Sequence, residues 1–296
     1  MGSEGLVQIG ERRGLEEGHS ARPNNRAPFA RYSVLFTSGK GGVGKSTVAV
    51  NTAVALAQQG LRVGILDADV YGPSVPRLLM LHEERLQWGE GDQMIPAENF
   101  GVKAMSVGFT TPESDTPLAW RSSVATSAIV QLIEDTAWGA LDVLIIDAPP
   151  GTGDVQLTMV QELRLSGAVV VTTPQLVATD DVRRALRMLR EVQVPVLGVV
   201  ENMSYFLAPD TQTLYRPFGE GGGARLAEEY GVPLLGALPL SSVVRASGDE
   251  GRPVVAGGPE LERRAFLELA RQIWEGLGGT RSAPAQGGGD GAPLPR

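Results

Sequence analysis

A glycine-rich segment near the N-terminus constrains the fold of this chain more than any other feature. Residues 38–47 read SGKGGVGKST. The preceding residues 33–38 (SVLFTS) are typical of a short buried strand, and residues 45–59 have the pattern of a helix that ends at Gly60. A strand, a glycine loop and a helix in this order predict backbone N–H groups that surround an anion at the positive end of the helix.

The segment contains the frame of a phosphate-binding loop, Gly39-x-x-x-x-Gly44-Lys45-Ser46. In this frame Lys45 bridges the β- and γ-phosphates of a nucleotide, and the Ser46 hydroxyl ligates Mg²⁺. The alternative is a glycine-rich turn without a ligand, but the correct order of strand, loop and helix favours the nucleotide. We therefore expect ATP and Mg²⁺ as ligands, with ATP contacted by Gly39, Lys40, Gly41, Gly42, Val43, Gly44, Lys45, Ser46 and Thr47.

The loop also holds two of the three lysines in the chain, which has 23 arginines. Lysine carries a compact point charge on a slim stem, whereas arginine presents a planar fork. Lys45 is explained by the phosphate loop, but Lys40 needs a reason of its own. The alternatives for Lys40 are chance clustering and a solvated loop side chain.

The rest of the chain alternates apolar runs with helical patterns. We expect strands at 62–67, 102–107, 142–147, 168–173, 196–201 and 233–238, and helices near 122–136, 154–164, 179–192, 222–230 and 259–275. Runs that are apolar throughout are buried on both faces, as in a parallel sheet with helices on both sides. The sequence predicts an α/β fold of the P-loop NTPase type, a doubly wound, mostly parallel sheet formed by residues 31–277. Residues 1–30 and 278–296 lack apolar periodicity and are expected to be disordered tails.

Three aspartates stand where predicted strands end, which is the edge where such sheets bind ligands. Asp147 ends the run LIID and is expected to hold Mg²⁺ or its waters. The Pro-Pro-Gly-Thr-Gly run after Asp147 is turn-rich and suits a sensor of the γ-phosphate. Asp67 and Asp69 are two residues apart, so both can face the nucleotide if the backbone is extended. One would hold a metal-bound water and the other would orient the attacking water; simple loop capping is the alternative.

Charge and composition exclude several classes of function. The net charge of −8 and the pI near 5.0 argue against nucleic acid and anionic membranes as partners. The chain has no signal-peptide pattern and no apolar run of membrane-spanning length, so we expect a cytoplasmic protein. Cysteine is absent, which excludes thiolate-bound metals or clusters on this chain.

From about residue 33 to 275 the chain closely resembles the Mrp/ApbC family of P-loop ATPases, the iron–sulfur cluster carriers related to MinD and ParA. The resemblance rests on SGKGGVGKST, LDADVYGPSVP, MSVGF, LIIDAPPGTGDVQLT, VVVTTPQ, GVVENMSYF and FGEGGGARLAEEYGVPLLGALPL. It implies a slow ATPase that works as a nucleotide-switched homodimer. Its partners would be an iron–sulfur scaffold or apo-client proteins.

The resemblance also implies roles for single residues. The family's loop is a deviant Walker A, in which the early lysine, here Lys40, acts on the nucleotide of the partner subunit. The catalytic residues would then be Lys40, Lys45 and Asp69, with Asp69 orienting water. Asp67 and Asp147 would serve Mg²⁺ together with Ser46, and Asn202 would contact adenine.

One departure from the family concerns the cargo. Members normally carry a Cys-x-x-Cys pair after ENMSYF, which bridges a cluster between subunits. Here Ala208 and Thr211 occupy the two positions. Alanine has no donor atom and a threonine hydroxyl is a poor ligand for iron–sulfur chemistry. We therefore expect no iron–sulfur ligands on this chain, and a partner that supplies the thiolates.

Two other functions remain as alternatives. One is a positioning ATPase of the MinD/ParA type, whose dimer grips a membrane or DNA. The C-terminal residues lack an amphipathic face and the net charge is negative, so both surfaces are disfavoured. The other is a nucleotide-gated scaffold that does not hydrolyse ATP.

Overall fold

The computed structural model describes residues 27–110 and 122–279. Most of the two predicted tails therefore lies outside the described residues. Ala27 is an exception, because it is 7% exposed and belongs to the hydrophobic core. The packed part of the chain thus includes residues that the sequence assigned to the N-terminal tail.

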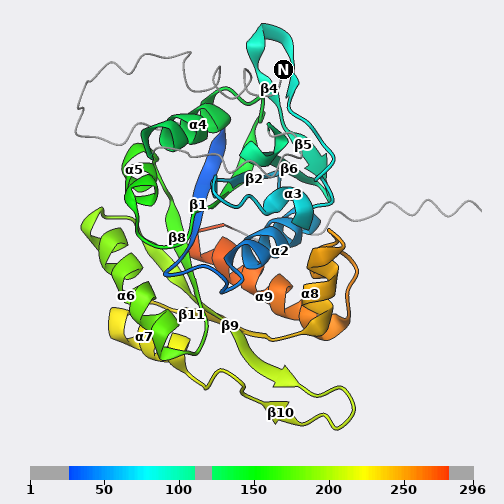
Figure 1. The fold of residues 1–296 in the computed structure, drawn as a ribbon, viewed down its shortest axis with the longest axis vertical. Coiled ribbons are helices and arrows are strands. Elements are labelled where there is room, and N and C mark those ends of the chain that lie inside the picture. The colour runs from blue at the N-terminus through cyan, green and yellow to red at the C-terminus, as the bar shows by residue number, and fades with distance from the viewer. Residues whose placement is uncertain (1–26, 111–121, 280–296) are drawn as a thin grey trace, which may run out of the picture.

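A nine-stranded sheet forms the centre of the described part of the chain (Figure 1). Its strand order is β10-β9-β8-β1-β7-β2-β6-β5, and β11 also pairs with β9. The strands are β1 (Ala30–Ser38), β2 (Val63–Asp67), β5 (Ala97–Asn99), β6 (Val102–Ser106), β7 (Leu141–Asp147), β8 (Gly167–Thr172), β9 (Val196–Leu207), β10 (Leu214–Tyr215) and β11 (Leu234–Pro239). The short strands β5 and β10 are antiparallel to their neighbours and the other pairings are parallel. The predicted mostly parallel sheet is confirmed.

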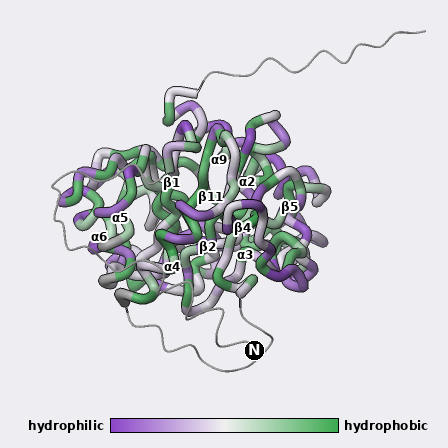
Figure 2. Tube along the Cα trace, turned by 90° about the horizontal axis from the view of Figure 1, so that it is seen from above, coloured by the Kyte–Doolittle hydropathy of each residue, from purple (hydrophilic) through white to green (hydrophobic). Residues whose placement is uncertain are grey.

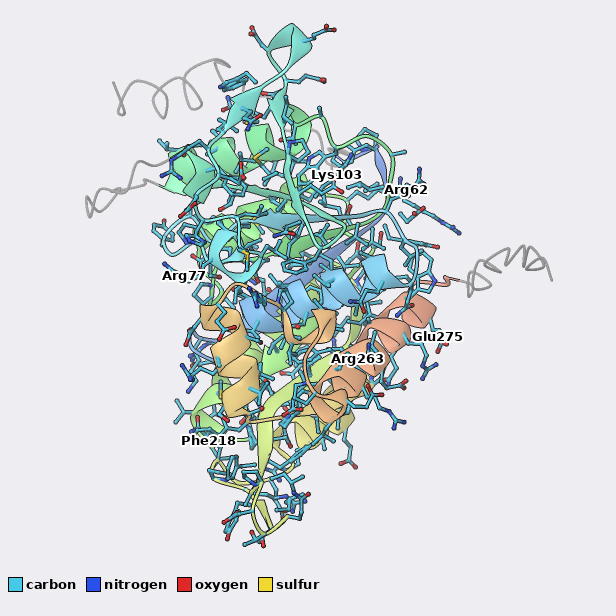
Figure 3. The ribbon with its side chains drawn as sticks, turned by 90° about the vertical axis from the view of Figure 1, so that its right-hand side faces the viewer. Arg62, Arg77, Lys103, Phe218, Arg263 and Glu275 are labelled. Carbon is cyan, nitrogen blue, oxygen red and sulfur yellow. The ribbon has the colours of Figure 1, made fainter. Side chains whose placement is uncertain are left out.

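Helices cover both faces of this sheet. They are α2 (Lys45–Gln58), α3 (Val75–Leu78), α4 (Ser122–Glu134), α5 (Asp154–Glu162), α6 (Leu176–Glu191), α7 (Gly222–Tyr230), α8 (Ser242–Asp249) and α9 (Glu260–Gly276). Helices α2 and α9 pack against each other on one face, and α4, α5 and α6 lie on the other (Figure 1). Figure 3 views the face with α2 and α9, where Arg263 and Glu275 of α9 lie at the surface. Two-residue strands β3 (Gln87–Trp88) and β4 (Met94–Ile95) form a separate ribbon, and short 3₁₀ turns span η1 (Glu90–Asp92), η2 (Val107–Phe109) and η3 (Val254–Ala256).

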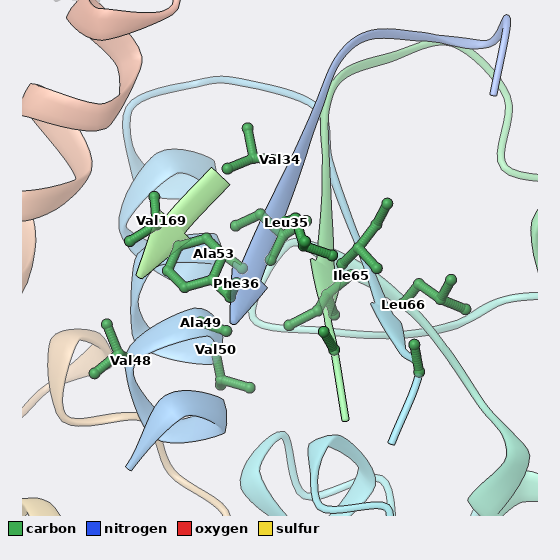
Figure 4. Close-up of a cluster of buried hydrophobic side chains, with 14 of the residues drawn as sticks. Val34, Leu35, Phe36, Val48, Ala49, Val50, Ala53, Ile65, Leu66 and Val169 are labelled. Atoms are coloured by element: carbon green, nitrogen blue, oxygen red, sulfur yellow. The ribbon is translucent and has the colours of Figure 1, made fainter. Parts of the chain in front are cut away.

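The core lies between the central strands and α2. Val34, Leu35 and Phe36 of β1 are fully buried against the small apolar side chains of α2 and the strands β2 and β8 (Figure 4). Valine and alanine on α2 let the helix lie close to the sheet. Hydrophobic segments accordingly gather in the middle of the molecule and hydrophilic ones at its periphery (Figure 2). This packing fixes α2, and with it the loop that precedes it.

Strand β9 differs most from the prediction. The sequence predicts a strand that ends at Glu201, but β9 continues to Leu207. The additional residues pair with β10 in a hairpin and with β11, where Pro239 lies opposite Tyr205. Asn202 therefore lies within a strand and not after its end. Helix α8 was not predicted at all.

Candidate nucleotide-binding site

The predicted functional residues meet at the carboxyl edge of three adjacent strands. In the order β1-β7-β2, Phe36 of β1 and Asp67 of β2 are both register partners of Asp147 on β7. The glycine loop leaves β1 at Ser38, directly beside these carboxylates. Parallel pairing thus brings together groups that are far apart in the sequence, as expected for an α/β ligand site.

Three of the four glycines of the loop, Gly39, Gly42 and Gly44, are required by its shape. Gly42 and Gly44 have φ angles of +81° and +83°, in the left-handed region that favours glycine. Gly44 is the N-cap of α2 and no side chain caps this end of the helix. A Cβ atom on Gly39 would lie 2.4 Å from the backbone of Asp181 in α6. The loop is therefore a tight backbone turn that ends at an uncapped helix N-terminus, which suits an anionic ligand.

Lys45 forms the closest charged contact of the site. Its Nζ lies 2.5 Å from Oδ1 of Asp147 and 3.2 Å from Oγ of Ser46. Lys45 is 6% exposed and Asp147 is fully buried. Two of the predicted metal ligands, Ser46 and Asp147, thus contact Lys45, the lysine that the sequence predicts to bind phosphate.

Asp67 organises the loop that follows β2. Its Oδ2 accepts hydrogen bonds from the backbone N–H groups of Ser74 and Val75, at 2.9 and 3.0 Å, and from the hydroxyl of Ser106 at 3.2 Å. Its Oδ1 accepts from the N–H of Asp69 at 3.2 Å. Complete burial, and then the charge of Asp147, raise the pKa of Asp67 to about 7. The negative charge of Asp147 therefore disfavours ionisation of the Asp67 carboxyl group.

Asp69 lies at the same edge and is partly buried. Burial raises its pKa, and the positive charge of Lys45 opposes this effect. A carboxyl group with a raised pKa next to a phosphate-binding loop suits the predicted role of orienting water.

The donor set fits Mg²⁺. Oδ2 of Asp147 is buried and has no hydrogen-bond partner among the described residues, and the Ser46 hydroxyl lies beside the same cluster. No group of three or more acidic or histidine side chains in the described ranges forms a metal-binding cluster by itself. Mg²⁺ usually takes one or two protein carboxylates and completes its shell with substrate phosphates and water. Ser46, Asp147 and Asp67 match that requirement, and the metal role of each stays a prediction.

Lys40 lies on the surface of the loop. It is partly exposed, and its ammonium makes no ion pair or hydrogen bond with other residues in the described part of the chain. The backbone of Lys40 is held in place, since its carbonyl accepts a hydrogen bond from Ser38 Oγ at 2.9 Å. This geometry leaves the Lys40 charge available to another molecule, and its action in trans stays a prediction.

Asn202 contacts the loop itself. Its Nδ2 donates to the carbonyl oxygen of Val43 at 2.8 Å, and the side chain is buried. A Cβ atom on Gly44 would lie 2.2 Å from this Nδ2, so glycine is needed for the close approach. Asn202 therefore ties β9 to the phosphate loop, while the predicted adenine contact is not tested.

Two buried polar residues near the site were missed by the sequence analysis. Glu201 accepts from the N–H of Gly223 at 2.6 Å and so binds the start of α7 to β9. Gln156 donates to the hydroxyl of Thr37, just before the loop. Neither belongs to a motif with an assigned chemistry, so only the fold could reveal these contacts.

The positions of the family's two cysteines, here Ala208 and Thr211, lie in the hairpin between β9 and β10. The N–H of Ala208 donates to Thr213 O at 3.0 Å, and the N–H of Gln212 donates to Ala208 O at 2.8 Å. Thr211 is exposed in the turn between them. The side chains at positions 208 and 211 offer one methyl group and one hydroxyl, and cysteine is absent from the whole sequence. These residues do not fit an iron–sulfur cluster.

Comparisons with known proteins show relatives that match most of this chain. The chain is 52% identical to the iron-sulfur cluster carrier protein of Deinococcus radiodurans over 247 residues, which cover 83% of this chain and 70% of the relative. It is 49% identical to the protein of the same name from Aquifex aeolicus, with 84% and 68% covered. None of the described helices is long and apolar enough to cross a bilayer.

Solved structures show the same fold. An Archaeoglobus fulgidus nucleotide-binding protein in complex with ADP is 38% identical, with a TM-score of 0.68, and the match covers 77% of this chain and 89% of that one. The cell division ATPase MinD of Pyrococcus furiosus is 22% identical with a TM-score of 0.59, covering 82% and 98%, and supports the fold alone. Residues 30–274 match the ParA family described as NUBPL iron-transfer P-loop NTPase. With a matching family over most of its length and a glycine-rich loop at the expected sheet edge, this chain belongs to the iron-transfer P-loop NTPases of the ParA/NUBPL type.

Proposed function

We propose that this protein binds ATP with Mg²⁺, hydrolyses it, and uses the cycle to assist iron–sulfur cluster delivery. The observation that carries the proposal is the cluster of Lys45, Ser46 and Asp147 at the end of the glycine loop, in which Lys45 and Asp147 are buried. A lysine, a hydroxyl and a carboxylate in this arrangement are the groups that bind a nucleoside triphosphate and its metal.

Binding would rearrange this cluster. The backbone of residues 39–44 and the N-terminus of α2 would hold the phosphates, and Lys45 would turn from Asp147 to the β- and γ-phosphates. Ser46, Asp67 and Asp147 would hold Mg²⁺, directly or through water, and the metal would neutralise phosphate charge. The amide of Asn202 would meet adenine from β9.

In hydrolysis, a water oriented by Asp69 attacks the γ-phosphorus, the bond to the β-phosphate oxygen breaks, and ADP and phosphate form. Negative charge spreads over the transferred group, so an additional cation lowers the barrier. We infer that Lys40 of a second copy of this chain supplies that cation when two ATP-loaded protomers meet. A partly exposed ammonium with no partner among the described residues supports this role.

The cluster-related role rests on the names of the relatives, which are iron-sulfur cluster carrier proteins. Because this chain has no cysteine, a partner would supply the thiolates that hold the cluster. The nucleotide cycle of the dimer would then control binding and release of that partner or of the apo-client.

Two assays test the proposal. Phosphate release from ATP should be slow in wild type and should depend on Mg²⁺ and on Lys40, and an inactive wild-type protein would refute hydrolysis. In the second assay, wild type and an Ala208→Cys/Thr211→Cys variant are reconstituted anaerobically with iron and sulfide. We expect cluster absorption only in the double variant, since the substitutions restore two thiolates on the hairpin. Stable holoprotein from wild type would contradict the need for a partner.

A further inference from the structure

Three successive residues at the end of β1 are bonded to the segment that follows Asp147. The carbonyl of Phe36 accepts from Ala148 N–H, and the carbonyl of Ser38 accepts from Gly151 N–H, both at 3.0 Å. Between them, the Thr37 hydroxyl accepts from Nε2 of Gln156 in the first turn of α5. The two outer bonds use backbone only, whereas the middle one depends on the Gln156 side chain.

Gln156 is placed where an apolar residue would pack better. It is 1% exposed and Thr37 is fully buried, and the neighbours Val155, Met159 and Val160 on α5 are buried apolar side chains. Oε1 of Gln156 has no hydrogen-bond partner in the described part of the molecule. Burying an amide that is only half satisfied costs free energy that a methionine of similar length would not. The contact is therefore poorly explained by stability alone.

The bond joins the two segments that a triphosphate would touch from opposite sides. Thr37 lies two residues before Gly39, on a central strand that is held by β7 and β8. Gln156 lies in the first turn of α5, directly after the loop 148–153, which contains Gly151 with φ +89°. Anchoring α5 to β1 restricts where this loop can lie, and a loop fixed in advance loses less entropy when it closes on a ligand.

We propose that Gln156 is a positioning residue for recognition of the third phosphate. Through Thr37 it holds loop 148–153 against the phosphate loop, so that the protein distinguishes ATP from ADP. This inference rests on the proposed function for the identity of the ligand, but its test does not require hydrolysis.

The test compares equilibrium affinities for ATPγS and ADP, both with Mg²⁺, in wild type, Gln156→Met, Thr37→Val and the double variant. We expect each single substitution to weaken ATPγS binding about fivefold, the net value of one hydrogen bond, with ADP affinity changed less than about twofold. The double variant should resemble the single ones, because all three remove the same bond. Gln131→Met on α4 is the matched control. It replaces a second buried glutamine that makes no hydrogen bond to β1, and should leave both affinities unchanged.

Other results would overturn the inference. Equal losses of affinity for ATPγS and ADP would indicate a general effect on the site. Unchanged affinities would show that Gln156 only packs in the core. Additive losses in the double variant would mean that the two side chains act separately. Urea unfolding should show the double variant at least as stable as wild type, because it leaves no buried polar partner of this bond unsatisfied. If Gln156→Met does not fold, Thr37→Val and the double variant decide. A wild type that binds ATPγS more tightly than ADP but never releases phosphate would refute the proposed hydrolysis and leave this inference standing.

Discussion

Replacing Lys45 by methionine should destabilise the protein in the absence of nucleotide and Mg²⁺, because Lys45 and Asp147 neutralise each other inside the fold. The two charged atoms are 2.5 Å apart and the side chains are 6% and 0% exposed. At an effective dielectric constant of about 20, their gross attraction is about 7 kcal/mol. Desolvation offsets much of it, and removing one partner of such a buried pair typically costs about 3–5 kcal/mol. Methionine keeps the length of the lysine stem, so the loss reports the charge.

A double-mutant cycle measures this interaction. Urea unfolding with a chelator present gives the free energy of unfolding of wild type, Lys45→Met, Asp147→Asn and the double variant. We expect a coupling of about 2–3 kcal/mol, with the double variant more stable than the sum of the single losses predicts. Effects that add within about 0.5 kcal/mol would refute a structural ion pair.

Three further predictions concern single positions. Gly39→Ala should lower the free energy of unfolding, measured by urea titration, by about 1–3 kcal/mol, because its Cβ would approach the α6 backbone to 2.4 Å. Gly41→Ala is the control. A Cβ atom there would meet no atom within 4 Å, so the free energy of unfolding should change by less than about 0.5 kcal/mol. The folded-state pKa of Asp67, about 7, lies above its unfolded value, so its stabilising contribution is present below about pH 4 and is lost as pH rises through about 7. Without ligands, wild type should therefore lose a few kcal/mol relative to Asp67→Asn between these pH values; parallel curves for the two proteins would contradict the raised pKa. Asn202→Ala removes the hydrogen bond to the Val43 carbonyl and should weaken the binding of both ATP and ADP about fivefold, as measured by calorimetry. Unchanged affinities for both nucleotides would show that β9 does not support the loop.

Much of the fold could be predicted because the central strands are apolar throughout. Runs such as VLIID and VVVTT are buried on both faces, and their alternation with helical patterns defines a parallel sheet. The glycine loop and the aspartates at strand ends followed from the same pattern, since parallel strands bring their carboxyl ends to one edge.

Contacts between distant segments could not be predicted in this way. Lys45 and Asp147 are 102 positions apart, and no periodicity relates them. The extension of β9 from Asn202 to Leu207 depends on pairing with β10 and β11, which overrides the polar character of Asn202. Gln156 reads as an ordinary helix residue until the fold places it against Thr37.

The proposed function depends on a lysine that acts on the neighbouring subunit, and mixing two inactive variants tests this most directly. Lys40→Ala lacks the donated cation, and Asp69→Asn lacks the group that orients water, so each alone should hydrolyse ATP very slowly. In a mixed dimer, the site of the Lys40→Ala subunit keeps its own Asp69 and receives Lys40 from its partner. Equal mixing should therefore restore about a quarter of wild-type phosphate release, because half of the dimers are mixed and one of their two sites is complete. A mixture no more active than the sum of its separate components would contradict action in trans.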